Sequence, residues 1–107
     1  MPRETTQVFP RERQLAEALG ARIRAARLRR RIPIVEMAAR VGIDRKTQSR
    51  LEKGDPSTSI AALVRNLSVL GLAGDLDYLA RDDEVGRRLV DLATPERPHR
   101  RGAAGRA

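Results

Sequence analysis

Residues 34–53 read IVEMAARVGIDRKTQSRLEK, which is the pattern of two short helices joined by a sharp turn. Ala38 lies where the two helices would touch, and crossing helices leave room there only for a small side chain. Gly42 supplies the positive φ that a tight turn requires, and Ile43 fills the corner after it. Asp44 then caps a second helix, because its carboxylate can accept hydrogen bonds from the first N–H groups. The order of these residues predicts a helix-turn-helix.

The second of these helices predicts a surface that reads DNA. The N-terminal part of such a helix enters the major groove, where basic and hydroxyl side chains reach the base edges. The alternative for any one of these side chains is a solvated or phosphate-bound charge. We expect base contacts from Arg45, Lys46, Ser49 and Arg50. We expect phosphate contacts at the edges of the unit from the side chains of Thr47, Arg40, Lys53 and Arg22, and from the backbone at Ile34.

Charge is unevenly distributed along the chain. The 107 residues carry a formal net charge of +8. Residues 1–54 hold 14 Lys and Arg against 6 Asp and Glu, whereas residues 71–92 hold 3 against 6. The basic total indicates a polyanionic partner, although it does not separate DNA from RNA or an anionic membrane surface. Because the acidic segment would repel DNA, we expect it to face a protein partner or a second subunit.

The composition argues against a metal site, a cofactor and enzyme activity. There is no cysteine, and the single histidine, His99, lies in a segment rich in Pro and Gly. Neither thiolate ligands nor a cluster of imidazoles is therefore available. No serine has an obvious paired base, and no Gly-rich phosphate loop follows a strand. We expect a protein that acts by binding.

The sequence also argues against a membrane protein. No apolar run approaches the roughly 20 residues that span a bilayer. The beginning of the chain, MPRETTQVFPRER, lacks the apolar stretch of a secretory signal. We therefore expect a cytoplasmic protein without a membrane partner.

Apolar periodicity predicts an all-α fold of five or six helices over residues 11–92. Residues 1–10 show no period and are expected to form a flexible arm. Residues 93–107 are basic, contain Pro and Gly, and are expected to form a disordered tail. With one Phe, one Tyr and no Trp, the core of such a domain would be modest and aliphatic.

The helices outside the central pair are predicted from their apolar faces and from the Pro, Gly and capping residues that begin, weaken or end them. Pro33 suits the first turn of the second helix, since that position needs no N–H donor. Gly20 is expected to weaken the first helix slightly. The inward stripe of that helix, residues 11–30, comprises Leu15, Ala18, Leu19, Ile23 and Ala26.

The fourth helix is expected to close over the first three. Ser59 would cap it and Gly71 would end it. Its inward face comprises Ile60, Leu63, Val64, Leu67 and Leu70. A short helix with Leu76 and Leu79 inside would follow, and then a last helix, capped by Asp82 or Asp83, that bears Val85, Leu89, Val90 and Leu92.

Three segments between Leu19 and Leu72 carry a family resemblance. The segments LGARIRAARLRRRIP, MAARVGIDRKTQSRLEKGDPSTSI and LVRNLSVLGL resemble the XRE family of lambda-repressor-like helix-turn-helix proteins. Within that family, GDPSTSI, VLGLAGDLDYLARDD and EVGRRL look like the HipB-type antitoxins, whose genes lie beside HipA-like Ser/Thr kinase toxins. The resemblance implies a homodimer that represses its own operon and binds the kinase. Such a dimer would place its reading helices about 34 Å apart, on an inverted-repeat operator in double-stranded DNA.

The resemblance also assigns structural roles and exposes two departures. It implies a buried ion pair between Arg27 and Glu52. The family usually has an aliphatic residue where this chain has Gln48, so the Gln48 amide needs a polar partner or access to water. The family often has Thr-Gln where this chain has Pro33 and Ile34, which removes one phosphate-contacting side chain.

Other interpretations remain open at this point. The chain could be an XRE-type transcriptional regulator without a toxin, or an adaptor that has lost specific DNA binding. The two departures at Gln48 and Ile34 motivate the adaptor. Side chains near the C-terminal end could form a dimer seam or only complete the monomer core: Tyr78, Leu79, Val85 and Leu89.

Overall fold

The computed structural model describes residues 6–93. These residues form six helices and no strand, which confirms the all-α prediction. The chain divides into two compact units, one ending at Leu76 and the other beginning at Asp77. Most of the predicted tail, with His99, and the beginning of the predicted arm lie outside the described residues. The helices are α1 (Pro10–Arg29), α2 (Ile34–Val41), α3 (Arg45–Glu52), α4 (Ile60–Val69), the 3₁₀ helix η1 (Ala73–Tyr78) and α5 (Glu84–Ala93).

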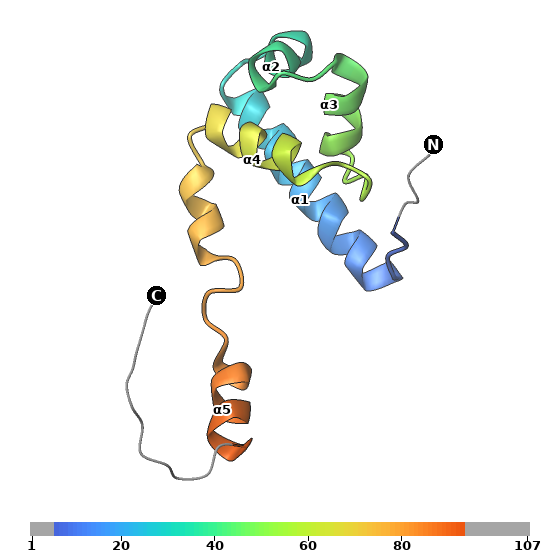
Figure 1. Ribbon diagram of the computed structural model, residues 1–107. Helices are drawn as coiled ribbons and strands as arrows, with labels where there is room; N and C mark the ends of the chain where they lie inside the picture. Colours follow the sequence, from blue (N-terminus) through green and yellow to red (C-terminus); the bar gives the residue numbers. More distant parts are fainter. Residues whose placement is uncertain (1–5, 94–107) are drawn as a thin grey trace. The chain divides into compact units, whose positions relative to one another are not determined.

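A sharp turn at Gly42 joins α2 to α3 in the first unit (Figure 1). Gly42 has φ 95° and ψ 28°, a left-handed conformation that glycine adopts without Cβ strain. Its N–H donates to the Ala38 carbonyl, which closes α2. Helix α2 packs against α3 and α4, and α1 packs against α3. The predicted helix-turn-helix is therefore present, with α1 and α4 supporting it.

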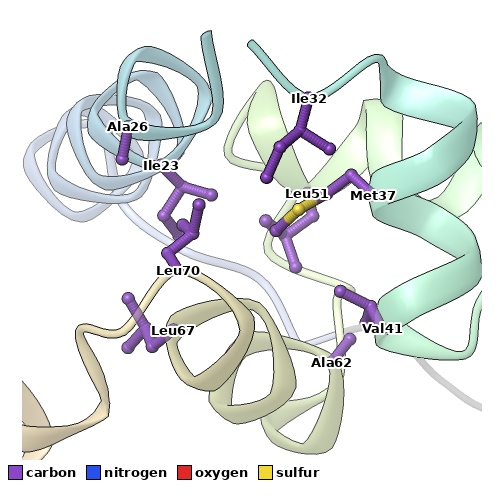
Figure 2. Close-up of a cluster of buried hydrophobic side chains, with 9 residues drawn as sticks. All are labelled: Ile23, Ala26, Ile32, Met37, Val41, Leu51, Ala62, Leu67 and Leu70. Carbon is purple, nitrogen blue, oxygen red and sulfur yellow. The ribbon is translucent and has the colours of Figure 1, made fainter. Parts of the chain in front are cut away.

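The core of the first unit is small and almost entirely aliphatic. Figure 2 shows side chains from all four α-helices and from the α1–α2 connection converging on one cluster. Met37 is fully buried in it, as an unbranched side chain that fills irregular space well. The buried members are Ile23, Ala26, Ile32, Met37, Val41, Leu51, Ala62, Leu67 and Leu70.

The predicted inward stripe of α1 is wrong at its first two members, whereas Leu19 is half-buried and packs against the core. Leu15 is 52% exposed and Ala18 is also exposed, whereas Ile23 and Ala26 are buried as expected. The buried part of α1 is instead Gly20, Ile23, Ala26 and Arg27. Helical periodicity therefore identified one face of α1, but only the half of the helix beside α3 has a partner to cover that face.

Gly20 is required because the C-terminal end of α3 lies directly against α1. A Cβ atom placed on Gly20 would lie 2.7 Å from the Glu52 carbonyl oxygen, the Leu51 carbonyl oxygen and the Gly54 amide nitrogen. All three are backbone atoms and cannot move aside as a flexible side chain would. The expected small cost of this glycine to helix propensity is therefore offset by a close helix contact.

We predict that Gly20→Ala destabilises the protein, although alanine is the better helix former. Overpacking of this kind costs about 1–3 kcal/mol, which exceeds the roughly 1 kcal/mol gain in helix propensity. Urea unfolding followed by circular dichroism measures the change. Gly74→Ala is the matched control, since a Cβ there meets nothing within 4 Å. A stabilised Gly20→Ala variant would contradict the close contact.

Helix α4 is rotated relative to the sequence prediction. Leu67 and Leu70 are buried as expected, but Ile60 is 77% and Val64 is 38% exposed. The buried side of α4 includes Ala62, Asn66 and Leu67. The prediction weighted large apolar residues only, so it missed the small Ala62 and the polar Asn66, which lie one helical turn apart.

The second unit contains α5, whose apolar residues are exposed. Asp83 is the residue that caps it, since its Oδ1 accepts from the Gly86 N–H at 3.0 Å. Asp82 instead pairs with Arg87 at 3.0 Å. Leu79 is 67% exposed, so its predicted inward position is wrong. Over residues 6–93 no helix is both long and apolar enough to cross a membrane.

Candidate nucleic-acid interface

Asp44 fixes the beginning of α3, as the sequence predicts. Its Oδ1 accepts a hydrogen bond from the Thr47 backbone N–H at 2.7 Å. This bond, together with the Thr47 hydroxyl and the nearby charges of Arg50 and Lys46, lowers the pKa of Asp44 below its ordinary value of 3.8. The carboxylate therefore serves as the cap of the helix N-terminus.

We predict that protonation of Asp44 weakens the fold in acid. Since the folded-state pKa is the lower one, this cap stabilises the protein above pH 3.8 and stops doing so as the pH falls through the folded-state pKa. Asn is also a good cap but does not titrate. The melting temperature of Asp44→Asn should therefore fall less than that of the wild type between about pH 5 and about pH 2.5. Equal losses in both proteins would show that Asp44 does not titrate with folding.

The predicted base-reading residues lie on the outward side of α3. Arg45, Lys46 and Arg50 are exposed, and Ser49 is half-buried. Within residues 6–93 none of these four side chains forms a hydrogen bond or an ion pair. At about 100° per residue, Lys46 and Arg50 point almost directly away from Gln48. The structure thus leaves three exposed cationic side chains and one half-buried hydroxyl on α3, and of these Lys46 and Arg50 point most directly outward.

The opposite side of α3 is buried, and it is mainly polar. Gln48 is fully buried, and Leu51 and Glu52 are nearly so. The Gln48 amide has the polar partner it needs in Asn66 of α4: Gln48 Nε2 donates to Asn66 Oδ1 at 2.8 Å, and Asn66 Nδ2 donates to Gln48 Oε1 at 3.1 Å. The sequence prediction missed Asn66. It lies one turn after Ala62 on the buried side of α4, a side that the sequence prediction did not identify.

Arg27 and Glu52, which the family resemblance assigns to an ion pair, meet in the interior. Arg27 Nε donates to Glu52 Oε2 at 2.7 Å, and Nη2 donates to Glu52 Oε1 at 2.9 Å. The two side chains are 7% and 3% exposed. Arg27 Nη1 also donates to the Ile32 carbonyl at 2.9 Å, just beyond the end of α1. One guanidinium thus holds both the C-terminal end of α3 and the connection to α2.

We predict that Arg27→Ala is severely destabilising, because it leaves the Glu52 carboxylate buried without its cation. The loss should be about 3–5 kcal/mol in the free energy of unfolding. Arg40→Ala is the control, since Arg40 pairs with Glu36 at the surface and such pairs contribute at most about 1 kcal/mol. Urea unfolding midpoints of the two variants give the comparison. Similar midpoints would show that burial of the Arg27 pair has no special cost.

The residues expected at phosphates lie around α3 but differ in their surroundings. Arg40 is exposed and already engaged with the Glu36 carboxylate one turn before it. Thr47 is half-buried in the first turn of α3, and Lys53 is exposed at its C-terminal end. Arg22 lies on α1 and is exposed. These side chains come from α1, α2, α3 and the residue that follows α3, and their contact with phosphate stays a prediction.

The N-terminus of α2 differs slightly from the prediction. Pro33 is the residue before the helix, with φ −63° and ψ 150°, and Ile34 is the first helical residue. Pro33 was expected within the first turn, so that placement is one residue off. No side chain caps this helix. Its first backbone N–H groups, at Ile34 and the residues after it, therefore have no acceptor from a capping side chain.

Arg65 is a further residue of the interface scaffold that the sequence prediction missed. From α4, its Nη2 donates to the Arg40 carbonyl at 2.7 Å and its Nε donates to the Val41 carbonyl at 3.4 Å. These carbonyls belong to the last turn of α2, where a cation also suits the helix dipole. Arg65 therefore supports the end of α2 beside the turn. An isolated arginine on an expected surface gives no sequence signal for this role.

Comparison with known proteins agrees with this geometry. A family model described as a helix-turn-helix domain matches residues 18–79, which is more than half of the chain. The chain belongs to this helix-turn-helix family. No curated protein and no solved structure matches the chain. The matched segment includes all of Leu19–Leu72, the region that resembles the XRE family.

Membership of the helix-turn-helix family indicates DNA binding and regulation of transcription. Proteins of this kind act by binding, so the family gives no expectation of catalysis. In the described residues, 6–93, no group of three His, Cys, Asp or Glu is placed to hold a metal ion.

Proposed function

We propose that this helix-turn-helix protein is a sequence-specific repressor and the antitoxin of a HipA-like kinase, which it inhibits by binding. The observation that supports DNA reading is the exposed face of α3. Arg45, Lys46 and Arg50 are exposed on this helix and Ser49 is half-buried, and none of the four side chains is engaged within residues 6–93. Arginine can bind guanine through two hydrogen bonds, so Arg45 and Arg50 are the favoured base contacts.

Phosphate contacts would orient the protein on its site without reading sequence. The side chains of Thr47, Arg40, Lys53 and Arg22, and the backbone N–H at Ile34, are the proposed contacts. Engagement of Arg40 with phosphate would compete with its exposed pair to Glu36, which is a weak interaction. The first turn of α2 suits a phosphate, because free backbone N–H groups and the positive end of the helix dipole favour an anion at a helix N-terminus.

A homodimer would bind an inverted repeat with its two α3 helices one DNA turn apart. The second unit offers the surface for such contacts or for the toxin. Its apolar residues do not form a buried core: Tyr78 is 71% exposed, Leu79 67%, Val85 66% and Leu89 59%. Of the two roles open for these residues, their exposure favours a protein contact.

The antitoxin, the regulator without a toxin and the adaptor can be distinguished by the neighbouring gene and by the surroundings of Gln48. A HipA-like reading frame next to the gene would favour the antitoxin, and its absence would favour an XRE-type regulator without a toxin. The adaptor hypothesis rested on Gln48 and Ile34. Because Asn66 satisfies the buried Gln48 amide, Gln48 gives no reason to expect a damaged reading helix.

We predict that the protein binds the DNA upstream of its own gene and that Arg45→Ala and Arg50→Ala each weaken this binding by about 1–3 kcal/mol. Titrations at two salt concentrations, with scrambled duplex as competitor, measure the loss. Both variants should unfold at the wild-type temperature, since neither side chain has an intramolecular partner among residues 6–93.

Arg88→Ala is the control, because it removes the same charge from the second unit. Its effect on specific binding should be small. Unchanged affinity in both α3 variants would contradict the assignment of α3 as the reading helix. Weak binding by the wild type that salt abolishes and that ignores sequence would instead favour the adaptor.

A further inference from the structure

The buried side of α3 contains a polar network that spans three helices. Glu52 Oε2 accepts from Arg27 Nε at 2.7 Å and from Gln48 Nε2 at 2.8 Å. Gln48 then pairs reciprocally with Asn66, whose Nδ2 also donates to the Ala62 carbonyl at 3.0 Å. Both amide groups use both of their N–H donors, and Gln48 and Asn66 are 0% exposed. The network therefore connects α1, α3 and α4 without an unsatisfied amide donor.

An apolar residue at each of these two positions would satisfy burial more simply. Replacing a buried hydrogen-bonded pair by apolar groups of the same shape is often neutral for stability. Stability alone therefore does not explain why this chain places two amides between its aliphatic cluster and the buried Arg27–Glu52 pair. What hydrogen bonds add is direction, since their strength falls steeply with misalignment, whereas apolar contact has no preferred angle.

The direction matters because Gln48 lies opposite the reading face. Lys46 and Arg50 are about 160° from Gln48 on either side of α3. A rotation of α3 by about 10° moves a side chain at a radius of about 5–6 Å by about 1 Å. Binding groups need to be held within about 0.5 Å and 10–20° of their working geometry. A rotation of about 10° is therefore large enough to misplace a contact with a base.

We propose that the Gln48–Asn66 amide pair fixes the rotation of α3 about its own axis and thereby sets how strongly the protein discriminates between DNA sequences. Gln48 and Asn66 are positioning residues, which act through Lys46 and Arg50 and do not touch DNA. This inference rests on the proposed DNA-reading function. Phosphate contacts tolerate a small rotation better, so affinity for unrelated DNA should change little.

The test compares the wild type with Gln48→Met/Asn66→Leu, which replaces both amides by apolar groups of similar shape. The variant removes the hydrogen bond from Gln48 Nε2 to Glu52 Oε2 and leaves the two Arg27 donors that pair with this carboxylate unaltered in sequence. The probe is the duplex that the wild type selects from a pool of random sequences, measured against a scrambled duplex. The discrimination ratio is the dissociation constant for the scrambled duplex divided by that for the selected duplex. We expect this ratio to fall at least about tenfold in the variant, the equivalent of one lost base contact, with the affinity for the scrambled duplex nearly unchanged.

Two further variants separate positioning from stability. Asn66→Ser introduces a hydroxyl that can bond to the Ala62 carbonyl but is too short to reach Gln48. This variant should lower the discrimination ratio, and it provides the test if the double variant does not fold. Leu70→Val is the control, because it weakens the core without touching the network. It should lower the melting temperature and leave the ratio at the wild-type value.

Each outcome decides between the possibilities. A ratio within about twofold of the wild type in both folded amide variants would overturn the positioning role and leave the DNA-reading function intact. An equal fall of the ratio in Leu70→Val would show that loss of stability alone explains the effect, which also overturns it. If the wild type selects no sequence from the pool, the DNA-reading function fails, and the positioning role fails with it.

Discussion

The Glu52 carboxylate is the group on which the arrangement of the first unit depends. It lies at the end of α3, is nearly buried, and accepts hydrogen bonds from Arg27 of α1 and Gln48 of its own helix. A buried carboxylate is tolerated only when it is paired and fully hydrogen-bonded, so its partners are constrained as well. Gly20 follows from the same arrangement, because α1 must approach the backbone of Glu52 closely enough to form the pair.

The supports of the helix-turn-helix are therefore of two kinds. The aliphatic cluster around Met37 supplies most of the burial and brings the four helices together. Polar contacts then set how the elements are oriented: Arg27 with Glu52, Gln48 with Asn66, and Arg65 with the last carbonyls of α2. This division suits a small domain whose outward face carries exposed basic side chains, since the face is held rigidly from behind.

The helices were predictable because local signals mark them: Gly42 in the turn, Asp44 and Ser59 at the caps, and regular apolar spacing. Burial was harder to predict. Leu15 and Ile60 match the apolar period and are nevertheless exposed, since nothing among residues 6–76 covers these two side chains. For the predicted base-contact residues of α3, helical geometry alone was enough to predict which side chains are exposed. Asn66 and Arg65 were missed because their partners lie 18 and 24 or more residues away, and no local pattern records such a contact.

The two amides between α3 and α4 limit how the protein can be re-engineered. Transplanting the outward residues of another helix-turn-helix protein onto α3 leaves the buried contacts of the helix unchanged. Transplanting the whole helix would introduce an aliphatic residue at Gln48 and leave the Asn66 amide without its reciprocal partner, at a cost of about 1–3 kcal/mol. A chimera of this chain is therefore best designed with position 66 exchanged together with α3, although it belongs to α4.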